Sequence, residues 1–397
     1  MEKYNTAQPI VFKKGLYDLN DNDNLNYELN RLVNWDGGDL EELSSVSKSI
    51  KTFADWKRVL LELGEKAEKE ERWENAIGYY RMAEFYIPHD DPDALKTYNH
   101  ARELFYEYYG DYFEGENPVV VKDSVPYEDT EMPVMIVKAD GEKKGTFVVH
   151  GGYDSYYEEF LFPMLYLKQH GYDVYLFEGP GQGEMLRLKN KPLIPEWEKP
   201  VKALLDKYNL KDVTIIGISL GGYLAPRAAA YDKRIQRVVS WGVFHSLIEN
   251  MNVTAGKAAS GAFNLLALPK VQDKMLEMTK KKAAEGNLKA GVLVDALHKI
   301  GASSFSEGMK WVKACSISHI ASLIDQDILV MGMDHDVLCS HLQVSREIKE
   351  MKNVKSFTFR LFTNKEEAGD HCSCGNTKLV LDEILSWMAS LDARDCE

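Results

Sequence analysis

The stretch "TIIGISLGGYL", residues 214–224, places a serine between two glycines where an apolar strand pattern gives way to a helical one. A strand that turns sharply into a helix strains the residue at the turn. It also brings two chain segments too close for side chains two positions away on either side. Gly217 and Gly221 meet that demand, so Ser219 is predicted to be an exposed nucleophile. The helix after Ser219 directs its free N–H groups toward negative charge that develops there.

The composition restricts the partners of the chain. Its 397 residues include 62 acidic and 48 basic side chains, which give a formal charge of −14. This balance argues against the basic surface of a nucleic-acid binder. The first residues lack the apolar core of a signal peptide, and no uninterrupted apolar run reaches about 18 residues. We therefore expect a cytoplasmic protein with a small-molecule substrate and without nucleic-acid or membrane partners. A homodimer is left open.

The cysteines do not form a recognisable framework. Five of them are scattered along the chain, unlike the regular spacing of a disulfide-bonded domain. They are Cys315, Cys339, Cys372, Cys374 and Cys396. The "HCSC" run at 371–374 lacks the second cysteine pair that would complete a tetrahedral metal site. The sequence therefore predicts neither a metal nor an organic cofactor.

The chain changes character near residue 117. Before it, residues 52–88 and 91–113 carry apolar side chains at helical spacing, and Asp91 followed by Pro92 is typical of a helix start. We therefore predict a helical N-terminal region over 1–116 and an α/β domain over 117–397.

The second part alternates strand-like and helix-like segments. Near-continuous apolar strands separated by helices indicate a mostly parallel central sheet with helices on both faces. The predicted strands are 132–139, 145–150, 172–178, 212–219, 236–242, 327–333 and 354–362.

An insertion interrupts this alternation. Between Trp241 and Asp327 the sequence is helix-like and has no strong strand. We predict a helical lid over about 245–322, above the carboxyl ends of the strands. The apolar residues of 260–271 and 293–305 are expected to line an enclosed pocket for a mostly apolar ligand.

A serine nucleophile needs a histidine base and an acid that orients it. Of the ten histidines, His371 alone follows the last predicted strand and precedes a final helix. This is where a base can lie over the carboxyl edge of the sheet. The acid is expected just after the strand 327–333, where Asp334 and Asp336 both qualify. Asp334 is preferred because it is closer to the strand end, and Asp336 is the alternative.

The loop after strand 145–150 reads "HGGYDSYYEEF". Its glycines let the backbone turn toward the pocket, so the N–H groups of Tyr153 and Leu220 are predicted to form the oxyanion hole. His150 is expected to brace the loop. Carboxylates of Asp154 and Glu158 could reach a substrate. Trp241, near a strand end, is a further candidate pocket residue.

Four segments together resemble the α/β-hydrolase superfamily: "HGGYDSYYEE", "LFEGPGQGE", "GISLGGYLAPRAA" and "EEAGDHCSCGN". More closely, they are similar to the branch that includes 2,6-dihydroxypseudooxynicotine hydrolase, fungal polyketide-shortening hydrolases and FrsA-like proteins. The resemblance covers roughly 117–395 and implies Ser219 as nucleophile, His371 as base and Asp334 as acid. The spacing of "GMDHD" departs from the branch whichever aspartate is the acid.

The resemblance implies a serine hydrolase that works through an acyl-enzyme. Members of this branch cleave carboxylic esters and also carbon–carbon bonds next to ketones. A substrate of moderate size, aromatic or acyl, is expected. Two alternatives remain, an acyltransferase with the same triad and a non-catalytic binding protein of the same fold.

Overall fold

The computed structural model describes residues 1–153, 155–250 and 269–397. The chain divides into two compact units. One contains Met1–Pro118 and Lys257–Trp311, and the other contains Val119–Gly256 and Val312–Glu397. The N-terminal region and much of the sequence insertion thus belong to the same unit, although they lie far apart along the chain.

The N-terminal part of the first unit is helical. Thr52 and Asp55 form a capping box at the start of α3, and Asp91 caps α5 with Pro92 in its first turn. The helix start predicted at Asp91 is therefore confirmed. The helices are α1 (Asp23–Trp35), α2 (Leu40–Val46), α3 (Phe53–Lys69), α4 (Trp73–Phe85) and α5 (Pro92–Tyr108).

Helices from the insertion complete the first unit. They are α12 (Pro269–Ala284), α13 (Leu288–Lys299) and most of α14 (Phe305–Ala314). A Cβ on Gly291 of α13 would lie 2.8 Å from the Phe53 ring, so helix and ring are in close contact. The imidazoles of His298 and His89 stack with centroids 3.5 Å apart. These contacts tie the insertion to the N-terminal helices.

The lid function of the insertion stays a prediction. Most of the apolar segment 260–271 lies outside the described residues. The segment 293–305 is described and covers the end of α13 and the turn to α14.

The second unit is built on an eight-stranded sheet in the order β1-β2-β4-β3-β5-β6-β7-β8. β1 and β2 pair antiparallel, as do β2 and β4, and the other pairs are parallel. The strands are β1 (Val121–Tyr127), β2 (Thr130–Val137), β3 (Gly145–His150), β4 (Tyr172–Phe177), β5 (Val213–Ile218), β6 (Ile235–Trp241), β7 (Asp327–Met333) and β8 (Ser356–Phe362). The mostly parallel sheet is as predicted.

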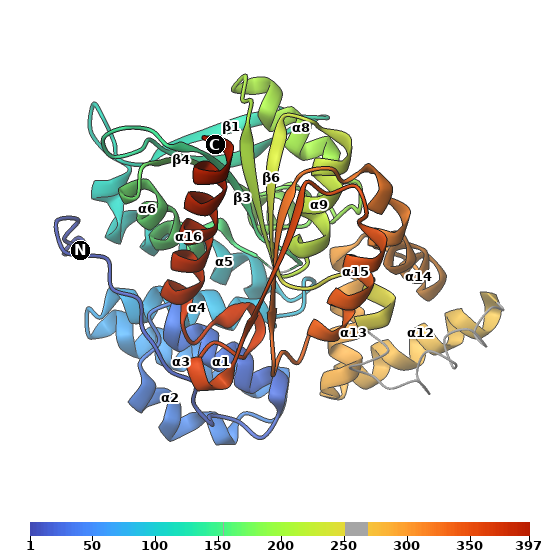
Figure 1. Cartoon of the computed structure of the whole chain (residues 1–397). Helices are drawn as coiled ribbons and strands as arrows, with labels where there is room; N and C mark the ends of the chain where they lie inside the picture. The colour runs from blue at the N-terminus through green and yellow to red at the C-terminus, as the bar shows by residue number, and fades with distance from the viewer. Residues whose placement is uncertain (154, 251–268) are drawn as a thin grey trace. The chain divides into compact units, whose positions relative to one another are not determined.

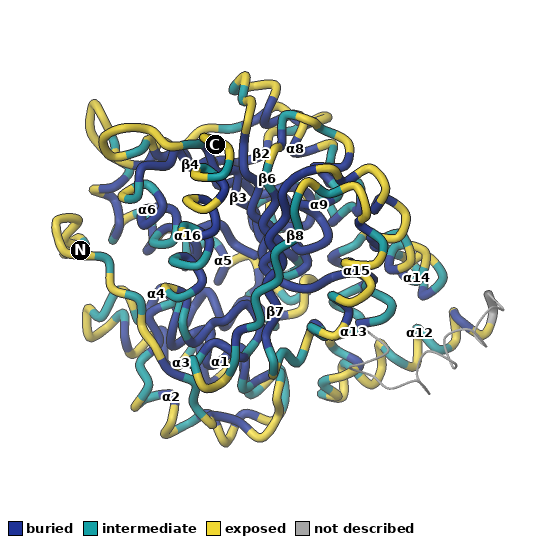
Figure 2. Tube along the Cα trace, viewed as in Figure 1, coloured by how far each residue is buried: buried dark blue, intermediate teal, exposed yellow. Residues whose placement is uncertain are grey.

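The sequence missed β1. Its residues read VKDSVPY, and the first half of the strand is exposed, since it lies at the sheet edge. A polar edge strand that contains proline has no continuous apolar run to reveal it. The inner strands β4, β5 and β7 are buried along their whole length, and β8 at the other edge has intermediate exposure (Figure 2).

Helices cover both faces of this sheet. In Figure 1, α6 and α16 lie on one side of it and α8 and α9 on the other. The helices of this unit are α6 (Leu161–Gln169), α7 (Gly183–Arg187), α8 (Glu198–Lys207), α9 (Gly221–Tyr231), α15 (Val344–Glu350) and α16 (Thr377–Asp395). No helix among the described residues combines the length and apolar character needed to cross a bilayer.

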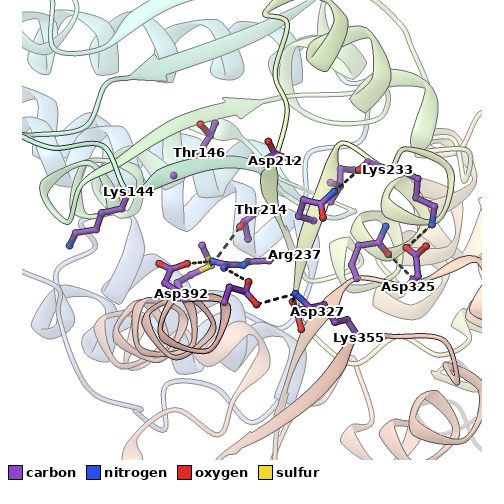
Figure 3. A pocket seen from close by; sticks show the side chains of 16 residues that line it. Lys144, Thr146, Asp212, Thr214, Lys233, Arg237, Asp325, Asp327, Lys355 and Asp392 are labelled. Carbon is purple, nitrogen blue, oxygen red and sulfur yellow. Dashed lines mark hydrogen bonds and ion pairs between the residues drawn. The ribbon is translucent and has the colours of Figure 1, made fainter. Parts of the chain in front are cut away.

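A hollow of about 540 Å³ lies at the amino ends of the parallel strands (Figure 3). Its walls carry many charges, several of which form ion pairs: Arg237 contacts Asp392 at 2.6 Å, and Lys233 contacts Asp325 at 2.7 Å. Ligand sites of parallel sheets lie at the opposite, carboxyl ends. We therefore interpret this hollow as a structural, ion-paired edge of the sheet.

Glu347 is a buried carboxyl in α15. Its side chain faces the Phe244 backbone amide, and within the described part of the chain Oε2 has no hydrogen-bond partner. Burial raises the pKa of Glu347 to about 8. The folded chain therefore holds a proton that the unfolded chain releases near pH 4.5. As a result, this group's contribution to stability is complete below that pH and is lost as the pH rises toward 8.

We predict that Glu347→Gln removes this pH dependence, because the amide keeps the shape and carries no charge. The variant and the parent should have similar free energies of unfolding at pH 5. At pH 8 the variant should be more stable, by up to about 5 kcal/mol for a shift of this size. Urea unfolding across this range measures the difference. Parallel pH profiles for the two proteins would contradict the assignment.

Candidate active site

Ser219 sits at the sharp turn between β5 and α9. Its φ of 60° lies in the left-handed region, which costs a non-glycine residue of the order of 1–3 kcal/mol. Its N–H donates to the Trp241 carbonyl at 2.9 Å, which fixes the turn against the end of β6. A Cβ on Gly217 would lie 2.1 Å from the Gly221 carbonyl oxygen, so only glycine fits there. The predicted strained turn is present.

The second tight position is Gly222 and not Gly221. A Cβ on Gly222 would lie 2.2 Å from the Gly242 carbonyl oxygen, whereas the nearest atom to one on Gly221 is the Gly151 oxygen at 3.3 Å. Gly221 matters through its own carbonyl, which crowds Gly217. The sequence could not show this, because the clash at Gly222 comes from β6, a strand further along the chain.

His371 reaches the serine from the loop after β8. Its Nε2 lies 2.8 Å from Ser219 Oγ, so the hydroxyl can donate its proton to the ring. The imidazole is 2% exposed, and Ser219 is only partly buried. Cys372 and Ser373 after it have φ of 54° and 50°, and the Trp241 indole N–H donates to the Cys372 carbonyl at 3.0 Å. The structure thus brings the predicted serine and histidine together.

The preference for Asp334 as the orienting acid is corrected, because the carboxylate at His371 belongs to Asp336. Its Oδ2 lies 2.8 Å from His371 Nδ1, and its side chain is 1% exposed. Its Oδ1 accepts the N–H groups of Leu338 and Cys339, both at 2.8 Å. The backbone of the loop therefore binds one carboxylate oxygen of Asp336. The other oxygen accepts the hydrogen bond from the His371 Nδ1–H.

Asp334 has a different set of contacts. Its Oδ1 accepts the Asn364 N–H at 3.1 Å and lies 2.8 Å from Nδ1 of the exposed His335. The main chain beside it is also tied to the β8 side, through the Asp334 N–H to the Phe362 carbonyl and the His335 N–H to the Gly369 carbonyl. Asp334 therefore joins the ends of β7 and β8.

The loop after β3 lies beside the serine. A Cβ on Gly152 would lie 2.6 Å from the Leu220 amide nitrogen, so the Gly152 peptide adjoins one of the predicted oxyanion donors. The Gly152 carbonyl accepts the Gln182 amide at 3.0 Å, and its N–H donates to Ser155 Oγ at 2.8 Å. In a trans peptide the next N–H points away from that carbonyl. Because the Gln182 side chain holds the Gly152 carbonyl, the Tyr153 N–H points away from Gln182.

Sequence reasoning missed Gln182. It lies in the glycine-rich "FEGPGQGEM" segment, and its own Oε1 accepts the Gly179 N–H at 3.0 Å. Both ends of the amide are thus used inside the protein. The sequence carries no local signal for this role, because the partner carbonyl of Gly152 lies 30 residues earlier in the chain.

His150 is a bracing residue, as expected. Its Nδ1 lies 2.8 Å from the Gly151 carbonyl, and its ring lies 5.1 Å from that of Trp197. Burial lowers the pKa of His150 to about 4, so the ring is neutral near pH 7.

The candidate pocket residues stay predictions. Asp154 lies outside the described residues. Glu158 is buried in the short 3₁₀ helix Tyr157–Phe160, and Trp241 is 2% exposed with its N–H directed at the histidine loop.

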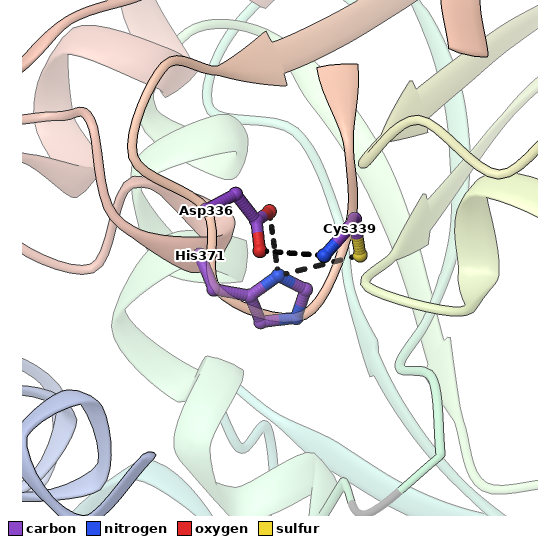
Figure 4. Close-up of side chains that lie close together, drawn as sticks. All are labelled: Asp336, Cys339 and His371. Atoms are coloured by element: carbon purple, nitrogen blue, oxygen red, sulfur yellow. Dashed lines mark hydrogen bonds and ion pairs between the residues drawn. The ribbon is translucent and has the colours of Figure 1, made fainter. Parts of the chain in front are cut away.

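Cys339 is a neighbour of the histidine that the sequence did not indicate. Its Sγ lies 3.5 Å from His371 Nδ1 (Figure 4). Burial, together with the nearby Asp336 carboxylate, raises the pKa of this thiol well above its usual range.

Comparison with known sequences supports the same architecture. A family model described as "alpha/beta hydrolase fold" matches residues 147–304. "Alpha/beta hydrolase psoB" of Aspergillus fumigatus is 31% identical over 54% of this chain and 56% of its own length. "Hydrolase acrC" of Aspergillus aculeatus is 31% identical over 44% of this chain and 46% of its own. The chain thus spans about half the length of these curated relatives.

Comparison with solved structures agrees with this. The 2,6-dihydroxy-pseudo-oxynicotine hydrolase aligns with a TM-score of 0.62 and 21% identity, over 91% of this chain and 94% of that one. A likeness at this identity shows the fold alone. Together with the sequence match and the strand order, it shows that the chain has the α/β-hydrolase fold.

Proposed function

We propose that this protein is a serine hydrolase in which Ser219, His371 and Asp336 form the catalytic triad. The observation that carries the proposal is the continuous line of contacts from Ser219 Oγ to His371 Nε2 and from Nδ1 to Asp336, each 2.8 Å long. Asp336 holds the imidazole with Nε2 free to accept the serine proton. No other residue type is needed to generate the nucleophile.

The reaction begins when Ser219 Oγ attacks the substrate carbonyl carbon while His371 takes its proton. The carbonyl oxygen becomes an oxyanion, which the N–H groups of Leu220 and Tyr153 and the start of α9 stabilise. His371 then passes the proton to the leaving group, and the acyl-enzyme forms. Water activated by the same histidine attacks the acyl carbon and releases Ser219.

Two leaving groups fit this chemistry. An ester releases an alcohol, and a ketone with a second activating carbonyl releases a stabilised carbanion that takes the proton at carbon. The relatives and the structural neighbour are named hydrolases, which supports hydrolysis over acyl transfer. The apolar sequence segments 260–271 and 293–305 are the reason we propose a substrate of moderate size that is aromatic or acyl.

We predict that a fluorophosphonate probe labels Ser219, located by peptide mass mapping of the parent protein. Ser219→Ala should fold normally and lose both labelling and turnover, the latter by several orders of magnitude. His371→Ala should abolish labelling at neutral pH, because the hydroxyl loses its base. Labelling on another serine, or undiminished labelling of the histidine variant, would overturn the triad.

The two aspartates provide a matched pair. Asp336→Asn should lower kcat by roughly 10⁴, because an amide at this position favours the wrong imidazole tautomer and cannot stabilise the imidazolium. Asp334→Asn should cost far less, since its remaining oxygen can still accept the Asn364 N–H. Steady-state kinetics on one substrate compares them. If the Asp334 variant lost more activity, the acid assignment would be wrong.

We also predict that kcat/KM rises from short acetyl esters to aromatic and longer acyl substrates. An enclosed apolar pocket gains affinity with each buried apolar group. A panel of esters, thioesters and β-diketones measures this trend and shows which bond is cleaved. Equal kcat/KM across the panel would mean that the insertion does not form such a pocket.

A further inference from the structure

His371 and two neighbouring side chains form a group of three different types that can each bind a metal ion. Asp336, Cys339 and His371 each offer one ligand atom, and these atoms lie within 4.8 Å of one another (Figure 4). Within residues 1–153, 155–250 and 269–397, this is the one such group of three or more. The carboxylate and the imidazole belong to the proposed triad, but the thiol has no part in it.

The spacing of the cluster suits a tetrahedral ion. Typical zinc bonds of about 2.3 Å to sulfur and 2.0–2.1 Å to nitrogen place those two atoms about 3.6 Å apart. The Cys339 Sγ to His371 Nδ1 distance is 3.5 Å. The Asp336 oxygen, now 2.8 Å from Nδ1, would have to move outward to about 3.4 Å. The change in this oxygen–nitrogen separation is about 0.6 Å.

We propose that this cluster is an inhibitory binding site for a thiophilic divalent cation such as Zn²⁺. A thiolate, an imidazole and a carboxylate are ligands that zinc accepts together, and three protein ligands leave a fourth position for water. The site is not a cofactor site, because an ion there blocks the proposed chemistry. The loop Asp334–Leu338 beside it is partly exposed.

The inhibition follows from the tautomer of His371. In the proposed triad Nδ1 carries the proton, donated to Asp336, and Nε2 is free to accept one from Ser219. An ion bound at Nδ1 displaces that proton, and a neutral ring must then carry it on Nε2. Nε2 becomes a donor and can no longer act as base. Binding releases one proton to solvent, from the Cys339 thiol, while the ring proton moves between its nitrogens.

Cobalt tests binding without any assay of activity. The whole protein, treated with EDTA and dialysed, is titrated with Co²⁺, which gives a thiolate-to-cobalt charge-transfer band. We expect one equivalent to bind with this band in the parent and in Cys372→Ser and Cys396→Ser, which keep the cluster. The band should be absent in Cys339→Ser. His371→Ala retains the thiol and should weaken Co²⁺ binding at least tenfold.

Zinc tests the consequence, and this arm rests on the proposed function. The rate of fluorophosphonate labelling is measured for each variant with Zn²⁺ and with EDTA. Zn²⁺ should slow labelling of the parent at least tenfold, and EDTA should restore it. Labelling of Cys339→Ser and Cys339→Ala should change less than twofold between the two conditions.

The two arms separate the failures. Absence of the cobalt band in the parent, or its persistence in Cys339→Ser, would overturn the metal site. Equal zinc inhibition of the parent and the Cys339 variants would overturn it as the cause of inhibition. If the protein shows the Cys339-dependent cobalt band but takes no label even in EDTA, the metal site is supported and the proposed hydrolase function is contradicted.

Discussion

The strained turn at Ser219 is the constraint on which the active site depends. The left-handed conformation of Ser219 is strained, and close packing of the surrounding backbone stabilises it. Gly217 lies against the Gly221 carbonyl, and Gly222 lies against the Gly242 carbonyl. The Gly222 contact requires β5 to lie next to β6, with Ile218 opposite Trp241. The order of the strands therefore makes the close packing around this turn possible. With β3 on the other side of β5, the Gly152 peptide arrives beside the Leu220 amide.

The other two residues of the proposed triad come from the far edge of the same sheet. β7 and β8 run parallel, so their carboxyl ends deliver the Asp336 loop and the His371 loop to one place. Trp241 connects this edge to the nucleophile, because its carbonyl accepts the Ser219 N–H and its indole donates to the loop that carries His371. One residue thus holds both the turn at Ser219 and the loop that carries His371.

The sequence predicted the parts of this arrangement that local patterns encode. Seven strands, the turn at Ser219 and the position of His371 follow from apolar runs, glycine spacing and chain order. β1 escaped because an exposed edge strand carries no apolar signal. Closeness to the strand end favours Asp334, whereas the structure places Asp336 at His371. The loop turns back on itself through the bonds of Asp336 to Leu338 and Cys339, and no spacing rule reveals such a turn. Cys339 and Gln182 act through non-local contacts, with His371 and with the Gly152 carbonyl respectively.

The two aspartates after β7 both help to position His371, each through a different part of the loop. Asp336 holds the ring of His371, and Asp334 holds the chain that carries it. The Asp334 carboxylate bonds to Asn364 and lies so close to Gly369 that a Cβ there would be 2.3 Å from it. Gly369 also accepts the His335 N–H, two residues before His371. The backbone of the histidine loop is therefore set by Asp334 and the orientation of its side chain by Asp336. The two carboxylates after β7 thus have separate structural roles, of which the proposed chemistry uses only that of Asp336.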